Sequence, residues 1–126
     1  MINPDQSAEP FDATISRTID NMWDRYRSQI LERVAVLESA ASAVTAKSLS
    51  ASECEAAHAA AHKLAGTLGM FNLERGTVLA RELEASYAPE SPPNPDEAAR
   101  FASLAAELRT MIENRKPGSE NRKSSS

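Results

Sequence analysis

Apolar residues recur at spacings of three and four near the start of the chain, and no other feature constrains the fold as strongly. A period near 3.6 residues is typical of a helix that buries one face, so the sequence predicts one long helix over about 12–47. Trp23 flanks this stripe and is expected to seal its edge. Such a helix must lie against others to be stable in water. The stripe consists of Ile15, Ile19, Met22, Tyr26, Ile30, Val34, Leu37, Ala41 and Val44.

The composition favours an all-helical protein. Hydrophobic residues make up 41% of the 126 residues and aromatic residues only 5%, while good helix formers dominate. No alternating run of β-branched residues is long enough to predict a strand. The length is sufficient for one domain with a modest core, and we predict an all-α fold, an up-down four-helix bundle.

Local signals predict the second and third helices. Ser50 and Glu53 form the S-x-x-E pattern of a capping box, which predicts a helix over about 51–71. Asn72 is expected to break that helix, because asparagine tolerates a left-handed turn. The short reversal then predicts an antiparallel helix over about 73–87.

Prolines and polar segments set the remaining boundaries. The run from Ala88 to Pro95 is rich in proline and predicts a loop, after which Asn94 caps a last helix that stops before Lys116. The predicted organisation is a polar lead-in over 1–11, the bundle over 12–116 and a disordered tail over 117–126.

One reactive side chain stands out on the predicted second helix. His62 points roughly 120° away from the centre of the apolar face, toward solvent or a partner. Gly66 and Gly69 follow one and two turns later on the same side. A glycine inside a helix costs about 0.5–1 kcal/mol relative to alanine, so a bare surface beside His62 indicates clearance for an approaching group. Helix termination would explain Gly69, but it explains Gly66 poorly because the apolar period continues past it.

The segment from His62, H-K-L-A-G-T-L-G-M-F-N-L, resembles the signature of histidine phosphotransfer (HPt) domains. That signature is a phosphorylatable His, a Gly four residues later and a small residue or Gly around seven later, followed by a helix reversal. L-A-R-E-L-E at 79–84 is also similar to the family. Two positions depart from it. Many members have Lys three residues after the His, where this chain has Ala65, and many have Gly at the helix break, where it has Asn72.

The resemblance implies a bacterial-type phosphorelay in which His62 accepts a phosphoryl group from a receiver-domain phospho-aspartate and passes it to another. Lys63 is the candidate cation for the phosphoryl group, although it can equally be a solubilising lysine, and Arg81 or an arginine of the first helix could serve instead. The chain would be a phosphocarrier without a cofactor, and Mg²⁺ is expected on the receiver. The receiver-docking face is expected to include His58, Ala65, Gly66 and Gly69.

Other chemistry is less well supported by the residues. His58 and His62 form H-x-x-x-H, which can bind zinc on a helix. No glutamate follows His58, so the metalloprotease pattern is absent, and a third ligand would have to come from Glu55 or another helix; we therefore predict no metal site. Glu84 and the other carboxylates are expected on solvated faces, with no pair placed for acid–base chemistry. The net charge of −4, with both signs interleaved, argues against nucleic acid as the main partner.

The sequence also bears on compartment and on alternative functions. It has no apolar run of about 18 residues and no signal-peptide pattern, and Cys54 is its only cysteine; we expect a cytoplasmic monomer. The alternative function is a non-catalytic helical protein-binding module, a degenerate HPt-like scaffold, which the departure at Ala65 would fit. The dimerisation helices of a histidine kinase are disfavoured, because no acidic residue follows His62 directly.

Overall fold

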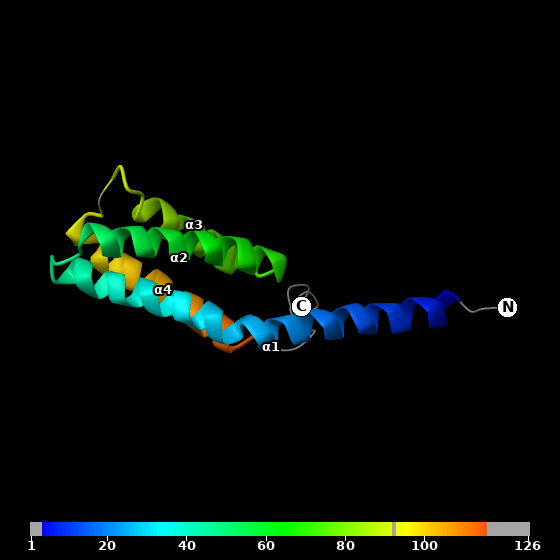
Figure 1. The fold of residues 1–126 in the computed structure, drawn as a ribbon. Coiled ribbons are helices and arrows are strands. Elements are labelled where there is room, and N and C mark those ends of the chain that lie inside the picture. Colours follow the sequence, from blue (N-terminus) through cyan, green and yellow to red (C-terminus); the bar gives the residue numbers. More distant parts are fainter. Residues whose placement is uncertain (1–3, 92, 116–126) are drawn as a thin grey trace.

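The structure, a computed structural model, describes residues 4–91 and 93–115, with side chains from residue 14 onward. It is an all-α four-helix bundle, as predicted (Figure 1). The elements in chain order are α1 (Pro4–Thr45), α2 (Ala51–Met70), α3 (Glu74–Ser86), the 3₁₀ helix η1 (Pro95–Glu97) and α4 (Ala98–Glu113).

The first helix is longer than the sequence indicated. It begins at Pro4 rather than at about Asp12, so the lead-in predicted over 1–11 is helical from Pro4 on. Pro4 takes the first helical position, where the missing N–H of proline costs nothing. Figure 1 shows the N-terminal part of α1 extending past the ends of the other three helices. The tail predicted over 117–126 lies outside the described residues.

Near the N-terminal end of the bundled part of α1, the residues that face the bundle are not those that were predicted. Trp23, expected at the edge of the stripe, is buried with 3% exposure, whereas Tyr26 and Ile15 are 39% and 43% exposed. The indole of Trp23 packs edge-on against Phe71 with ring centroids 5.0 Å apart. Phe71, in the turn after α2, thus helps to bury Trp23, whereas Ile15 and Tyr26 of the predicted stripe are exposed. Ile19 and Met22, which lie between them, are half-buried and pack against the core.

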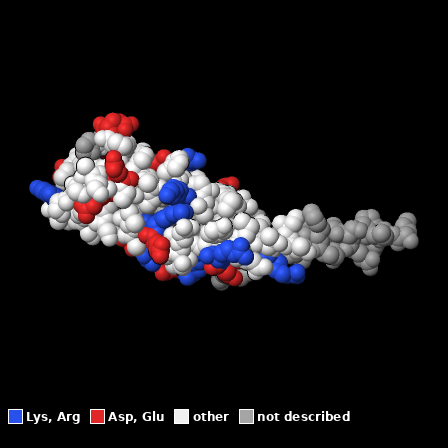
Figure 2. Space-filling view, in the orientation of Figure 1, with Lys and Arg blue, Asp and Glu red and all other residues white. Residues whose placement is uncertain are grey.

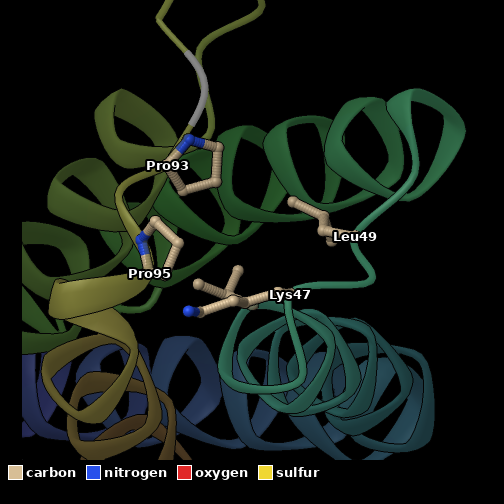
Figure 3. A pocket seen from close by; sticks show the side chains of 5 residues that line it. Lys47, Leu49, Pro93 and Pro95 are labelled. Carbon is tan, nitrogen blue, oxygen red and sulfur yellow. The ribbon is translucent and has the colours of Figure 1, made fainter.

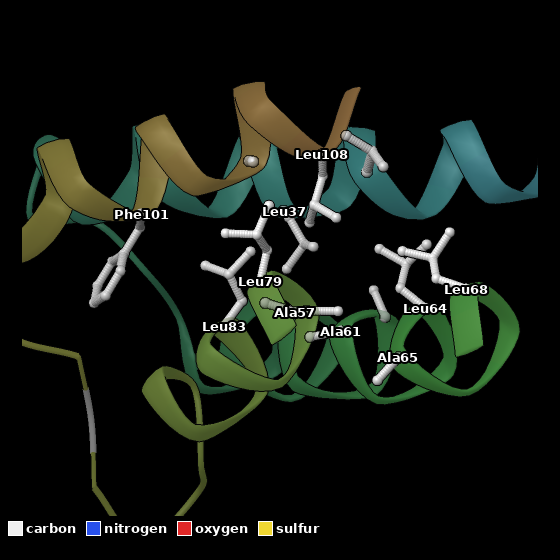
Figure 4. Close-up of a cluster of buried hydrophobic side chains, with 14 of the residues drawn as sticks. Leu37, Ala57, Ala61, Leu64, Ala65, Leu68, Leu79, Leu83, Phe101 and Leu108 are labelled. Carbon is white, nitrogen blue, oxygen red and sulfur yellow. The ribbon is translucent and has the colours of Figure 1, made fainter. Parts of the chain in front are cut away.

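The core lies between the α1–α4 pair and the α2–α3 pair. Figure 4 shows Leu64 and Leu68 of α2 pointing toward the α1–α4 side, while Leu108 of α4 points back at them. All three leucines are completely buried. Gly76 of α3 faces the same core, where an added Cβ would lie 3.0 Å from Leu68 Cδ1. The predicted apolar face of α2 is thus confirmed, and close packing fixes how α3 lies beside it.

The predicted ends of α2 are also confirmed. The Ser50 hydroxyl accepts from the Glu53 backbone N–H at 3.0 Å, and the Ser50 N–H donates to Glu53 Oε1 at 2.8 Å, which completes the capping box. At the other end Asn72 has φ of 62°, a left-handed conformation that asparagine tolerates. The chain reverses there, and α3 returns antiparallel along α2.

The start of the last helix follows the prediction only in part. Asn94 does cap it, since its side-chain oxygen accepts from the Asp96 N–H at 2.9 Å. The first turn is the 3₁₀ helix η1, and α4 begins at Ala98. A hollow of about 250 Å³ lies beside this turn, at the end of the bundle where α1 stops (Figure 3). It is lined by Val44, Lys47, Leu49, Pro93 and Pro95.

Candidate functional site

His62 stands on the outward side of α2, in the second half of the helix. Its neighbours Ala61 and Leu64 are completely buried, so the helical period turns His62 away from the core. The imidazole is 72% exposed. A reagent or a second protein can therefore reach the ring without any rearrangement of the bundle.

The imidazole of His62 is held by a carboxylate from the neighbouring helix. His62 Nδ1 lies 2.8 Å from Glu84 Oε2, and the Glu84 side chain is 23% exposed. An ionised carboxylate only accepts hydrogen bonds, so this pairing assigns the proton to Nδ1 and leaves the lone pair on Nε2. Nε2, the ring nitrogen further from the backbone, is the nucleophilic atom that remains open.

The main chain of Glu84 also contacts α2. Its carbonyl oxygen lies 2.9 Å from Nδ1 of His58, one turn before His62. His58 is half-buried and is turned onto α3 by this contact, although the sequence predicted it on the docking face. Both histidines thus fix how α2 lies beside α3 at Glu84.

Glu84 is the site residue that the sequence analysis missed, since it was expected on a solvated face without a role. A signal was nevertheless present in the chain. In two antiparallel helices joined by a short turn, residues about equally far from the turn lie side by side. His62 and Glu84 stand at comparable distances on the two sides of Asn72.

The helix surface beyond His62 is bare. A Cβ built at Gly66 would meet no atom within 4 Å, and one at Gly69 would meet only Thr77 Oγ1, at 3.7 Å. Neither glycine is therefore required by packing inside the molecule. The open surface agrees with the predicted clearance beside the ring.

Comparison with known families identifies this arrangement, because the model of the Hpt domain family matches residues 21–116. The chain belongs to the Hpt domain family. No curated protein and no solved structure matches it at a significant level. Hpt domains are phosphotransfer modules, and the family is one of phosphocarriers.

One predicted contact residue of this Hpt domain is misplaced. Ala65 was expected on the docking face but is only 3% exposed. It comes three residues after His62, whose ring contacts Glu84, and this spacing places it on the side of α2 that packs on α3. The prediction failed because the inter-helix contact extends further around α2 than the apolar stripe does. Ala65 therefore cannot contact a partner directly.

Two cations of the Hpt domain are exposed near the site. Lys63 lies about 100° around α2 from His62, and Arg81 belongs to α3, one turn before Glu84. In the part of the chain that the structure describes, neither makes an ion pair. Figure 2 shows that acidic and basic side chains are interspersed over the face in view.

Within residues 4–91 and 93–115, no three His, Cys, Asp or Glu side chains gather as a metal ion would require. Over that span, none of the helices combines the length and apolarity of a membrane span. Cys54 is half-buried and donates from Sγ to the Tyr87 carbonyl at 3.4 Å. Burial raises the pKa of this thiol.

Proposed function

We propose that this Hpt domain is a phosphocarrier of a two-component phosphorelay, with His62 as its phosphoacceptor. It takes a phosphoryl group from the phospho-aspartate of one receiver domain and passes it to the aspartate of another. The observation that carries the proposal is the 2.8 Å contact of His62 Nδ1 with Glu84, which leaves Nε2 open on an exposed ring.

The transfer needs one nucleophile from this chain. The lone pair of His62 Nε2 attacks phosphorus in line, the N–P bond forms, and the P–O bond to the receiver carboxylate breaks with its electron pair leaving on that carboxylate. The ring keeps its Nδ1 proton and becomes positively charged. Glu84 stabilises this charge through the same hydrogen bond and can accept the proton, and the reverse sequence returns the phosphoryl group.

The receiver domain supplies the other groups that the transfer needs. Mg²⁺ and the acidic pocket of a receiver domain provide most of the electrostatic stabilisation, and this chain needs no cofactor of its own. Docking takes place on the outward face of α2, where Gly66 and Gly69 leave the surface open and Met70 is 57% exposed. We place the reaction in the cytoplasm, as the single cysteine led us to expect.

The test is phosphotransfer from a receiver domain that has been phosphorylated by a small-molecule donor. The wild-type chain is compared with His62→Gln and with the matched control His58→Gln, one turn earlier on the same helix. We expect an acid-labile, alkali-stable label on wild type and on His58→Gln, and none on His62→Gln.

Each contrary result has a distinct meaning. A label that persists in His62→Gln and is lost in His58→Gln would move the acceptor to His58. No label on any folded variant, with several receivers tried, would contradict phosphotransfer and favour the non-catalytic binding module.

A further inference from the structure

Phosphorylation of His62 creates a charge problem at this site. A protein-bound phosphoryl group carries about 1.5 to 2 negative charges at neutral pH. On Nε2 it would sit on a ring whose other nitrogen already contacts the carboxylate of Glu84. When the receiver and its Mg²⁺ leave, a cation of this chain is needed to offset the accumulated negative charge.

The contacts between α2 and α3 indicate which cation of α3 lies near His62. Thr77 lies against Gly69, and Glu84 lies against His62. Arg81 comes four residues after Thr77 and three before Glu84, and these spacings keep all three on one face of α3. Arg81 therefore stands on the edge of α3 beside α2, about 4.5 Å along the helix axis from Glu84.

The surface of α2 beside Arg81 carries no large side chain. In the same antiparallel register Arg81 is level with Ala65 and Gly66 of α2, which present a buried methyl group and no side chain respectively. Arg81 is exposed, and over the described residues it makes no ion pair. By contrast, Arg75 of the same helix is bound to Glu107 of α4 at 3.0 Å.

Lys63 is the competing cation, and its position is less favourable. It projects from α2 about 100° from His62, whereas the His62 ring is turned toward α3 by Glu84. A lysine also provides a single compact charge. A guanidinium presents two parallel N–H groups that match two phosphoryl oxygens, and arginine has the longer reach.

The geometry points to Arg81 as the residue that contacts the phosphoryl group on His62, with its guanidinium reaching over Gly66 to donate to the phosphoryl oxygens. This inference rests on the proposed function, and it gives α3, through Arg81, a role in the same site. Arg81 then stabilises both the transferring phosphoryl group and the phosphohistidine that results.

The test uses the full chain and four variants: Arg81→Gln, Arg81→Lys, Lys63→Gln and the control Arg75→Gln. The rate of transfer from a phosphorylated receiver is measured at a saturating receiver concentration, so that weaker docking does not affect the measured rate. The half-life of phosphorylated His62 is then measured after the receiver has been removed. Thermal unfolding verifies that each variant is folded.

We expect Arg81→Gln to slow transfer at saturation about tenfold, a smaller loss than buried donors cause because the site is exposed. The half-life of its phosphohistidine should shorten as well, while Arg81→Lys keeps most of the rate. Lys63→Gln and Arg75→Gln should stay within about twofold of wild type.

The failures are distinguishable. An unlabelled wild type would contradict the proposed function, and this inference with it. A labelled wild type whose rate is matched by folded Arg81→Gln would overturn the role of Arg81 alone, and a slow Lys63→Gln in that experiment would transfer the role to Lys63.

Discussion

His62 Nδ1 and Glu84 Oε2 are 2.8 Å apart and belong to neighbouring antiparallel helices. The orientation of the His62 imidazole therefore depends on how α2 and α3 pack, and not on α2 alone. His58, which contacts the Glu84 carbonyl from the preceding turn, strengthens that dependence. Any change that shifts α3 along α2 should misalign Nε2 even if His62 itself is untouched.

Replacing Glu84 should slow phosphotransfer without preventing it. Glu84→Gln keeps an oxygen that accepts from Nδ1 but loses the charge, and Glu84→Ala loses both. A hydrogen bond to a charged group contributes about 1.5–3 kcal/mol when it is shielded, and the exposure of His62 reduces this. We expect rates in the order wild type, Gln, Ala, with a total loss of about tenfold, measured by rapid-mixing phosphotransfer.

Glu82→Gln is the matched control for Glu84. It removes the same charge from the same helix, but Glu82 is ion-paired with Arg100 of α4 instead of His62. Wild-type transfer by Glu84→Ala would show that the ring needs no support from α3.

Substitutions at Gly66 should affect the free energy of unfolding and the affinity for a receiver domain differently. Gly66→Ala should raise the free energy of unfolding by about 0.5–1 kcal/mol, because alanine favours the helix and its Cβ meets no atom within 4 Å. Gly66→Leu should fold as well, yet it should weaken receiver binding at least about tenfold by obstructing the surface beside His62. Chemical denaturation and titration with a receiver domain measure the two effects.

The control for added bulk is Ala106→Leu, at an exposed position of α4. It should leave receiver binding unchanged. Equal receiver affinity of wild type and Gly66→Leu would place the docking surface elsewhere on the bundle.

The helices could be predicted because their signals are local. The capping box at Ser50, the left-handed Asn72 and the apolar periods each depend on residues a few positions apart. His62 could be singled out for the same reason, since its direction and the two bare turns after it follow from one helix. Local rules were less reliable at the start of α1, where the helix continues to Pro4.

The remaining features depend on contacts between helices, which one helical period does not encode. Glu84 gains its role only when α3 folds back along α2. Ala65 is buried by α3, although it lies beside the apolar stripe of α2. Trp23 and Tyr26 differ in burial because Phe71, from the turn after α2, packs against Trp23.

Acidification should weaken the bundle through Glu38 of α1. Its carboxylate accepts from Nε and from a terminal nitrogen of Arg109 in α4, both at 2.8 Å, and these bonds hold its pKa below the usual 4.5. A carboxyl whose pKa is lowered by folding stabilises the native state above its unfolded pKa, and this stabilisation is lost as the pH falls through the folded value. Below about pH 4.5, we therefore expect the free energy of unfolding to fall less steeply with pH in Glu38→Gln than in wild type.

The size of this effect should be modest. Both side chains are about one-third exposed, at 38% and 33%, so solvent limits the difference to about 1 kcal/mol or less. Urea unfolding at neutral and acid pH measures it, with Glu90→Gln in the exposed loop as the control. Parallel pH profiles of wild type and Glu38→Gln would contradict the assignment.

Removing the hydroxyl of Tyr87 should stabilise the protein or leave it unchanged. Tyr87 is completely buried and packs against Phe101 with ring centroids 5.4 Å apart, but its hydroxyl has no hydrogen-bond partner among the described residues. An unpaired buried hydroxyl costs about 1–3 kcal/mol, so Tyr87→Phe should recover up to about 1 kcal/mol after the small void is counted.

Ultraviolet titration provides a second measurement on the same residue. Burial raises the pKa of Tyr87 to about 12, so the ionisation of one of the two tyrosines should be delayed to that pH and should disappear in Tyr87→Phe. Tyr26→Phe, at an exposed position, is the control and should leave stability unchanged. A loss of more than about 1 kcal/mol in Tyr87→Phe would mean that the hydroxyl is hydrogen-bonded in solution.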